Sequence, residues 1–290
     1  SALREAGRLD EAIPLYQQTL KDNTRTLGPN HPSTLTSRNN LASAYDDAGR
    51  LDEAIPLLEQ NLEDRIRILG PDHPHTLTTR HYLASAYHDA GRLDEAIPLY
   101  EQTLEDHTRI LGPNHPHTLT TRHNLASAYR DAGRLDEAIP LYERNLEECI
   151  HILGPHHPHT LTTRDNLAYT YHDAGRLDEA IPLYQQTLKD STHILGPHHA
   201  HTLTTRNNLA SAYHDAGRLD EAIPLLEQTL EDRTYILGPN HPHTLASRNN
   251  LAGAYRAAGR TKEAEALFET PSDSENEQDG TDTSDQETGN

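Results

Sequence analysis

The sequence predicts an all-α fold, a solenoid of antiparallel helix pairs, and three observations support this prediction. The tripeptide Ala-Gly-Arg recurs with its glycine 42 residues apart, at Gly7, Gly49, Gly91, Gly133, Gly175, Gly217 and Gly259. Each interval holds two segments whose apolar residues repeat with the period of an amphipathic helix. Both segments are copied almost unchanged from one interval to the next, which is typical of a protein built from stacked helix pairs.

The first helix of each repeat is represented by residues 202–216, TLTTRNNLASAYHDA. Leu203, Leu209, Ala210 and Tyr213 fall near positions i, i+6, i+7 and i+10, so they form one apolar stripe. We expect a proline at the first helical position, where its missing N–H removes no helical hydrogen bond. These prolines are Pro32, Pro74, Pro116, Pro158 and Pro242, and Ala200 takes the place in one repeat.

The second helix of each repeat is represented by residues 218–237, RLDEAIPLLEQTLEDRTYIL. The preceding glycine, Gly217, is expected in the left-handed conformation just past the end of the first helix. Pro224 lies inside the second helix, four residues after Asp220. If that aspartate caps the helix, the proline lies at the end of the first turn and removes at most one backbone hydrogen bond. The Leu-Gly-Pro triplet that follows is expected to end the helix.

Composition and charge exclude several classes of partner. A formal net charge of -20 leaves no basic surplus to displace counterions from phosphates, so we expect no nucleic-acid partner. The sequence has neither an apolar run of about 18 residues nor a signal peptide, so we expect no membrane partner. The single cysteine, Cys149, has no internal disulfide partner and fits a reducing cytosol. These features predict a cytoplasmic protein.

The repeat array is predicted to occupy residues 1–270, with a partial repeat at 1–28, five full 42-residue repeats and a partial C-terminal repeat. Residues 271–290 contain seven acids and neither a base nor an aromatic residue, which predicts a disordered acidic tail. The chain contains no methionine, and Ser1 begins in the middle of the repeat pattern. We interpret it as a piece of a longer or processed chain.

Histidines gather in the connections between repeats, as in ILGPHHPHTLTTR, residues 152–164. Every equivalent stretch also contains histidine, and packed helices would hold equivalent loops roughly 8 to 10 Å apart. Zinc ligands lie about 2 Å from their metal, so a metal shared between repeats is disfavoured and solvated helix starts are the favoured interpretation. A histidine-rich metal-binding protein is the alternative class of protein that this pattern leaves open. With 21 histidines in the chain, a pH-sensing role is a further hypothesis.

No catalytic or cofactor motif is present: the sequence lacks a phosphate-binding G-x-x-x-x-G-K-[ST] loop, an H-E-x-x-H pair and a G-x-S-x-G elbow. Cys149 is replaced by other residue types in the other repeats, so the repeat needs no thiol there. We therefore expect no enzyme activity, no cofactor and no metal site.

One arginine column either forms a basic ladder or, as we favour, pairs with nearby acids. Its members are Arg38, Arg80, Arg122, Arg164, Arg206 and Arg248.

The pattern HPxTLxxxNNLAxAYxxAGRLDEAIPLYEQxL resembles the tetratricopeptide repeat in its 42-residue form. That form occurs in kinesin light chains and in the sensor arrays of bacterial and fungal signalling NTPases of the NB-ARC or NACHT type. Ala210, Tyr213, Gly217 and Ala222 fall at the spacing of the family. The resemblance covers roughly residues 1–270. It implies a right-handed superhelix whose concave face, lined by the first helices, holds a peptide or partner helix.

The resemblance also implies which side chains face a partner. They are Asn39, Asn40, Asp46, His81, Tyr82, His88, His123, Asn124, Arg130, Asp165, Asn166, Tyr169, His172, Asn207, Asn208, His214, Asn249, Asn250 and Arg256. The columns that begin with Asn39 and Asp46 change chemistry between repeats, although most of the repeat is copied. They are seven residues apart and share one helix face, as expected for partner recognition. Free drift of solvated positions is the alternative.

These expectations combine into one predicted function. The chain is a non-catalytic interaction scaffold that binds a protein, a peptide or another domain of its own chain. Its predicted setting is the sensor or regulatory arm of a larger signalling protein, and a cargo adaptor similar to kinesin light chains is the competing setting.

Overall fold

The computed structural model describes residues 7–268, which are almost entirely helical and contain no β strand. The chain divides into two compact units, an N-terminal unit (Ser1–Arg176) and a C-terminal unit (Leu177–Asn290). The acidic segment 271–290, for which the sequence predicts disorder, lies outside the described residues.

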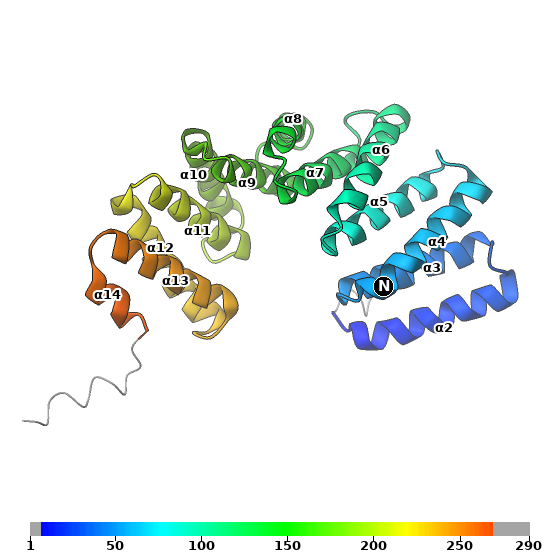
Figure 1. Ribbon diagram of the computed structural model, residues 1–290, viewed down its shortest axis with the longest axis horizontal. Coiled ribbons are helices and arrows are strands. Elements are labelled where there is room, and N and C mark those ends of the chain that lie inside the picture. The colour runs from blue at the N-terminus through cyan, green and yellow to red at the C-terminus, as the bar shows by residue number, and fades with distance from the viewer. Residues whose placement is uncertain (1–6, 269–290) are drawn as a thin grey trace, which may run out of the picture. The chain divides into compact units, whose positions relative to one another are not determined.

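The helices follow one another as hairpins (Figure 1). The N-terminal unit contains α2 (Leu9–Leu27), α3 (Pro32–Asp47), α4 (Leu51–Leu69), α5 (Pro74–Asp89), α6 (Leu93–Leu111), α7 (Pro116–Asp131), α8 (Leu135–Leu153) and α9 (Pro158–Asp173). The C-terminal unit contains α10 (Leu177–Ile194), α11 (Ala200–Asp215), α12 (Leu219–Leu237), α13 (Pro242–Ala257) and α14 (Thr261–Ala266).

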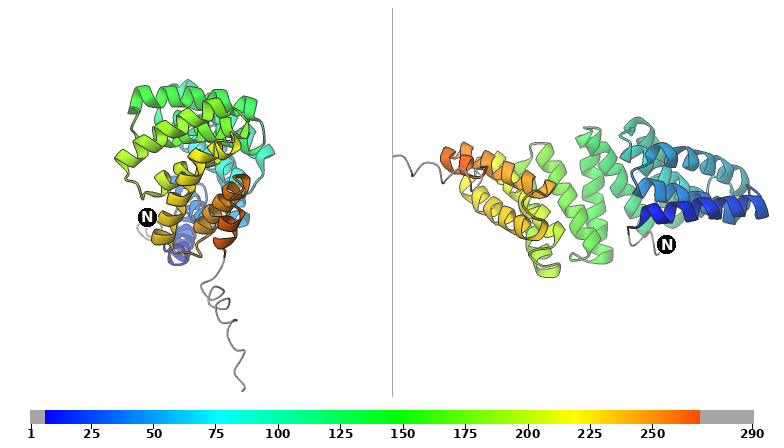
Figure 2. Two further views of the ribbon diagram at one scale, coloured as in Figure 1. Left: turned by 90° about the vertical axis from the view of Figure 1, so that its left-hand side faces the viewer. Right: turned by 90° about the horizontal axis from the view of Figure 1, so that it is seen from below.

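Within each unit every helix packs against its neighbour in sequence, from α2 to α9 and from α10 to α14. First helices of successive repeats also touch one another, as α3 and α5, α5 and α7, α7 and α9, and α11 and α13 do. The stacking of hairpins is visible from two further sides (Figure 2). The predicted all-α solenoid of helix pairs is confirmed, and the first helices form one layer in each unit.

The Ala-Gly-Arg turn has the predicted conformation, and its arginine has a role that the sequence analysis missed. Gly217 has φ 73°, and the next residue, Arg218, donates its backbone N–H to the Tyr213 carbonyl at 2.8 Å. The Arg218 guanidinium lies 4.4 Å from the centroid of the Tyr213 ring and 2.7 Å from the Glu221 carboxylate. One arginine therefore joins the end of the first helix to the beginning of the second.

The predicted aspartate cap of the second helix is wrong. Helix α12 begins at Leu219, one residue before Asp220, and its N-cap residue is Arg218, which makes no side-chain cap hydrogen bond. The aspartate instead lies in the first turn, where a negative charge is favourable beside the helix N-terminus. Pro224 is therefore the sixth helical residue, and the helix continues through it as predicted.

Helix ends at the repeat connections follow the sequence prediction. Second helix α12 ends at Leu237, and Gly238 leaves it with φ 90°. Proline occupies the first position of α3, α5, α7, α9 and α13, while α11 begins at Ala200. No helix in the described part of the chain combines the length and apolarity needed to cross a bilayer.

Fully buried polar residues on the second helices offer an internal test of stability. Thr103 and Thr229 are 0 % exposed, and each hydroxyl donates to the carbonyl four residues earlier, at 2.6 and 2.7 Å. Asn145 occupies the same column, is 0 % exposed, and neither atom of its amide has a hydrogen-bonding partner in the protein. A buried polar group without a partner destabilises a fold by about 1 to 3 kcal/mol.

We therefore expect Asn145→Thr to raise the free energy of unfolding by about 1 kcal/mol or more, because threonine bonds within its own helix. Denaturant unfolding followed by circular dichroism measures the change. Asn145→Ala is the control that removes the amide without adding a hydroxyl. A loss of stability in the threonine variant would contradict the assignment of an unsatisfied amide.

Candidate partner-binding site

The predicted partner-binding residues all lie on first helices. Those of the N-terminal unit lie on α3, α5, α7 and α9, and those of the C-terminal unit lie on α11 and α13. Two columns define the surface. The upstream column is Asn39, His81, His123, Asp165, Asn207 and Asn249, and the downstream column is Asp46, His88, Arg130, His172, His214 and Arg256. Exposure ranges from buried at Asn39 and Asp165 to exposed at Asn249 and Arg256.

Three side chains of the upstream column bond to the asparagine that stands 43 residues later on the next first helix. Asn124 donates its side-chain amide to His81 Nε2 at 3.3 Å, and Asn166 donates to His123 Nε2 at 3.1 Å. Asn250 donates to Asn207 Oδ1 at 3.2 Å. These contacts connect neighbouring first helices, so the column has a structural role that the sequence analysis did not foresee.

The downstream column is linked across helices as well. His88 Nε2 on α5 lies 2.7 Å from Asp131 Oδ2 on α7. Arg130 bonds to the same carboxylate at 2.9 Å, and its guanidinium lies 5.3 Å from the centroid of the Tyr169 ring. Tyr169 remains 40 % exposed, and so does Tyr82 on α5. The surface therefore combines interlinked polar groups with exposed aromatic rings.

Two cavities open between first helices where predicted residues meet. In the N-terminal unit, a cavity of about 210 Å³ is lined by Thr78, His81 and Tyr82 of α5, by His107 of α6, and by one histidine and two threonines of α7. In the C-terminal unit, a cavity of about 280 Å³ is lined by His214, Asn249 and Asn250. These recesses have a size and polarity that suit one side chain of a partner.

His107 belongs to the first of these cavities although it lies on a second helix. Its side chain is buried, its Nδ1 lies 3.0 Å from Thr121 Oγ1, and its ring stacks on His117 with centroids 5.9 Å apart. Burial and the neighbouring His117 lower the pKa of His107 to about 4. Burial likewise lowers the pKa of His81 to about 4. Both imidazoles are therefore neutral hydrogen-bonding groups at pH 7.

The connection histidines cap the first helices. His157 Nδ1 accepts the backbone N–H of His159 at 3.1 Å, and His73 accepts that of His75 at the same distance. The equivalent contact recurs at His31, His115, His199 and His241. An acceptor nitrogen at this place satisfies one of the free N–H groups of a helix start. Within residues 7–268, no group of three or more His, Cys, Asp or Glu side chains is arranged to hold a metal ion.

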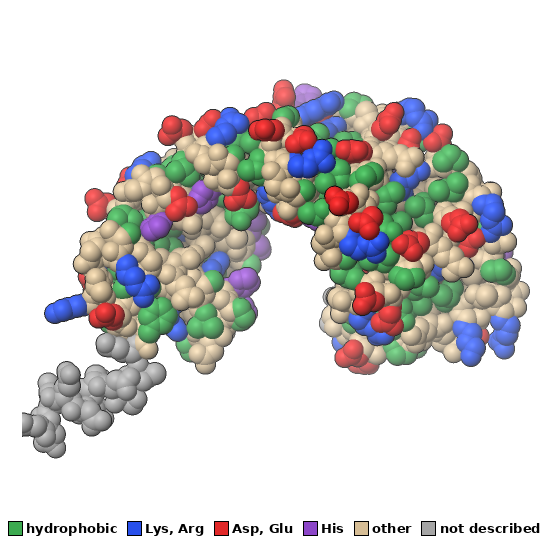
Figure 3. Space-filling view, in the orientation of Figure 1, with side chains coloured by type: hydrophobic (Ala, Val, Ile, Leu, Met, Phe, Trp, Pro, Cys, Tyr) green, Lys and Arg blue, Asp and Glu red, His purple; other side chains and the backbone are tan. Residues whose placement is uncertain are grey.

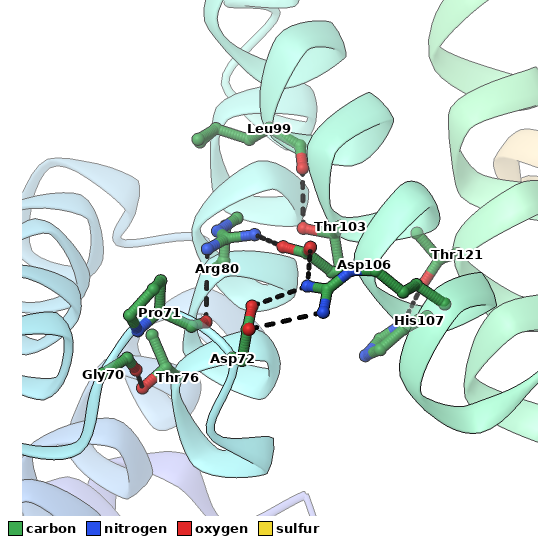
Figure 4. Close-up of polar contacts among 11 residues, drawn as sticks. Gly70, Pro71, Asp72, Thr76, Arg80, Leu99, Thr103, Asp106, His107 and Thr121 are labelled. Carbon is green, nitrogen blue, oxygen red and sulfur yellow. Dashed lines mark hydrogen bonds and ion pairs between the residues drawn. The ribbon is translucent and has the colours of Figure 1, made fainter.

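Most arginines of the repeated column pair with acids, as predicted. Arg80 is 2 % exposed and lies 2.6 Å from the Asp106 carboxylate, which also accepts from Arg109 at 2.7 Å (Figure 4). Arg38 and Arg206 form equivalent pairs at 2.7 and 2.6 Å. Arg122 pairs with Glu148, while Arg164 and Arg248 donate to the carbonyls of Pro155 and Pro239. The interpretation as a basic ligand-binding ladder is therefore disfavoured.

The sequence profile described as Tetratricopeptide repeat matches this chain six times, over residues 1–63, 47–106, 77–144, 118–192, 166–234 and 201–270. Among curated proteins, none matches the sequence. The comparison with solved structures shows similarity to a Podosopora anserina protein with nearly identical TPR-like repeats, which is described as a kinesin light chain. The identity is 35 % and the TM-score 0.62, and the match covers 68 % of this chain and 92 % of that one.

Two further structures share the fold at lower identity. BtubC from P. vanneervenii is 20 % identical with a TM-score of 0.67, and 81 % of this chain and 94 % of that chain are covered. A Signal Transduction ATPase with Numerous Domains from Pyrococcus horikoshii, which has a tetratricopeptide repeat sensor, is 17 % identical with a TM-score of 0.67. That match covers 88 % of this chain and 36 % of the ATPase. With six profile matches and a 35 % identical relative, the chain belongs to the tetratricopeptide repeat family.

Proposed function

We propose that the chain is a non-catalytic interaction scaffold that binds a peptide or a partner protein on the surface formed by its first helices. One observation carries this proposal. Members of the two columns whose chemistry changes between otherwise copied repeats line the cavities between first helices: His81 lines the first, and His214 and Asn249 line the second. Variation at recessed positions changes what each recess accepts, whereas variation at fully solvated positions would change little.

The chemistry of the recesses suits an extended or helical peptide. Asparagine amides donate and accept at once, so they can bond to the backbone of a bound chain. Exposed Tyr82 and Tyr169 add flat apolar area beside the polar groups, and tyrosine is enriched where protein surfaces recognise partners. The cavity beside His81 presents neutral imidazoles, which hydrogen-bond without a fixed charge.

The favoured setting is the sensor or regulatory arm of a larger cytosolic signalling protein. The similarity to an ATPase with a tetratricopeptide repeat sensor supports this setting, and the partner would then include another domain of the same chain. A cargo adaptor is the second candidate, because the 35 % identical relative is described as a kinesin light chain. In either setting we propose that no cofactor, nucleic acid or membrane takes part.

The test compares partners captured from a lysate of the source organism, identified by mass spectrometry. One variant of the full chain carries His81→Asn, His123→Asn and Asp165→Asn. This variant makes the upstream column uniform while keeping the type of contact that Asn250 makes with Asn207. The control carries three changes on second helices, Arg144→Gln, His151→Arg and His193→Arg, each to a residue found elsewhere in its column.

We expect the wild-type chain and the control to capture the same partner and the uniform variant to lose it, with helicity unchanged in all three. If the uniform variant retains every partner, the first-helix surface does not select partners and the proposal fails.

A further inference from the structure

We propose a second interaction surface on the N-terminal unit. It consists of the grooves between the second helix of one repeat and the first helix of the next, and it binds a cationic amphipathic segment of a partner protein. This inference does not rest on the first-helix site, because no residue of that site lines these grooves.

The first groove lies between α4 and α5, is open to solvent and has a volume of about 460 Å³. Its lining residues are Glu59, Leu62, Glu63, Ile66, Arg67 and Leu83. The second groove lies between α6 and α7 and is equally open, with a volume of about 510 Å³. Its lining residues are Glu101, Leu104, Glu105, Thr108, Arg109 and Leu125. Each lining position of the second groove is 42 residues after its counterpart in the first. The groove is therefore a property of the repeat.

A third copy of these residues follows at the packed helices α8 and α9. Glu143, Leu146, Glu147, Ile150 and Leu167 hold the same positions in the repeat. Ile150 is 40 % exposed, and Ile66 of the first groove is 41 % exposed. The repeat between them has Thr108 at this position and a partly exposed Leu104. Accessible apolar side chains thus recur in three consecutive repeats of one unit, and exposed apolar surface of this kind marks interaction sites.

The rims of the grooves are acidic and open to a cation. In the described part of the chain, the side chains of Glu63, Glu105 and Glu147 are exposed, and their carboxylates take part in no hydrogen bond or ion pair. The nearby arginines do not neutralise them, because Arg67 bonds to Asp64 at 2.6 Å and Arg109 bonds to Asp106 at 2.7 Å. Figure 3 shows acidic side chains next to hydrophobic ones over the face of the N-terminal unit turned to the viewer.

These features select one class of occupant. Lysine or arginine side chains would pair with the free glutamates while leucine-sized side chains would enter the apolar floor of each groove. A segment that offers both on one face is a cationic amphipathic helix. Anionic lipid surfaces and nucleic acids are disfavoured, because the same glutamates would repel their phosphates.

Other repeats of the chain provide a natural contrast. At the position of Glu63, two repeats carry Lys21 and Lys189, and at the position of Glu59 they carry Gln17 and Gln185. The acidic grooves therefore form an uninterrupted series only over α4 to α9. If this position needed only a charged side chain for solubility, glutamate and lysine would be equally suitable in every repeat.

The experiment measures binding of a synthetic, fluorescent Leu/Lys peptide of about 18 residues, which forms an amphipathic helix, to the full 290-residue chain. The groove variant carries Glu63→Gln, Glu105→Gln and Glu147→Gln. The matched control carries Asp52→Asn, Asp94→Asn and Asp136→Asn, which change the same number of exposed charges on the same helices α4, α6 and α8.

We expect the groove variant to bind about tenfold more weakly, since each exposed ion pair contributes a fraction of a kcal/mol and three are lost. The control should stay within about twofold of the wild-type chain. Equal losses in both variants would show attraction to overall charge and would overturn the proposal.

Two further arms address the apolar floor and the independence of the surface. A peptide with serine in place of leucine keeps every cation and is expected to bind at least about tenfold more weakly; equal affinity for both peptides would overturn the groove assignment. The His81→Asn, His123→Asn, Asp165→Asn chain should bind the Leu/Lys peptide as the wild-type chain does. A large loss there would place the peptide on the first-helix surface instead.

Discussion

Replacing Asp106 with alanine is expected to lower the free energy of unfolding by about 3 to 5 kcal/mol. The Arg80 guanidinium is 2 % exposed and has the Asp106 carboxylate at 2.6 Å, so the substitution leaves a buried positive charge without its counterion. Burial alone would raise the pKa of Asp106, but hydrogen bonds from Arg109 and Arg80 outweigh it and hold that pKa below its usual range. Denaturant unfolding measures the effect.

The same network provides a control for the Asp106 prediction. Asp72 also bonds to Arg109, at 2.7 Å, but this pair is more than half exposed on both sides. Asp72→Ala should therefore change stability by less than about 1 kcal/mol. Adding Arg80→Met to Asp106→Ala should recover much of the loss, because no charge is then left buried. Similar losses from the Asp72 and Asp106 variants would contradict the account of a buried, obligatory ion pair.

Acidification from pH 6.5 to pH 4 is expected to destabilise the part of the chain formed by α5, α6 and α7. Burial and His117 lower the pKa of His107 from 6.5 to about 4, so the folded state favours the neutral ring. The stability contributed by the neutral ring is present above pH 6.5 and is lost as the pH falls toward 4, because the unfolded chain binds the proton first. For His107 this loss reaches about 3 kcal/mol.

His107→Asn is the variant that tests the acid effect, since asparagine occupies this column at Asn23. Amide hydrogen exchange of α6 and α7 at several pH values measures local stability without assuming that the whole array unfolds in one step. We expect the variant to lose less protection than the wild-type chain between pH 6.5 and 4. Identical pH dependence in both chains would show that His107 titrates normally in the folded state.

Local sequence patterns predicted most of the fold, because the deciding contacts lie within a few residues. A proline at the start of α5 and a glycine after α11 act through the backbone of their own turn. The aspartate cap was wrong for an equally local reason. The Arg218 side chain contacts Tyr213, five residues earlier, and Glu221, three residues later. The rules for helix N-caps concern short side chains such as aspartate and serine, so they do not predict an arginine at this position.

The candidate site was predicted less completely, because its contacts depend on how separate helices are placed. The hydrogen bond between His81 and Asn124 spans 43 residues, one more than the repeat, so the period of the sequence does not reveal it. His107 joins the cavity of α5 and α7 from a second helix, and the sequence analysis did not include it among the partner-binding residues. Only the packing of three helices brings it beside His81.

The most direct measurement of the central claim is site-specific photo-crosslinking in a lysate of the source organism. A photoreactive phenylalanine analogue replaces Tyr82 or Tyr169 on the first helices, or Tyr235 on α12, which is 90 % exposed and serves as the control. We predict that positions 82 and 169 join to a common partner that position 235 does not reach. If the analogue at position 235 crosslinks to the same partner, or if position 235 is the only one of the three that crosslinks to a partner, the partner does not bind on the first-helix surface.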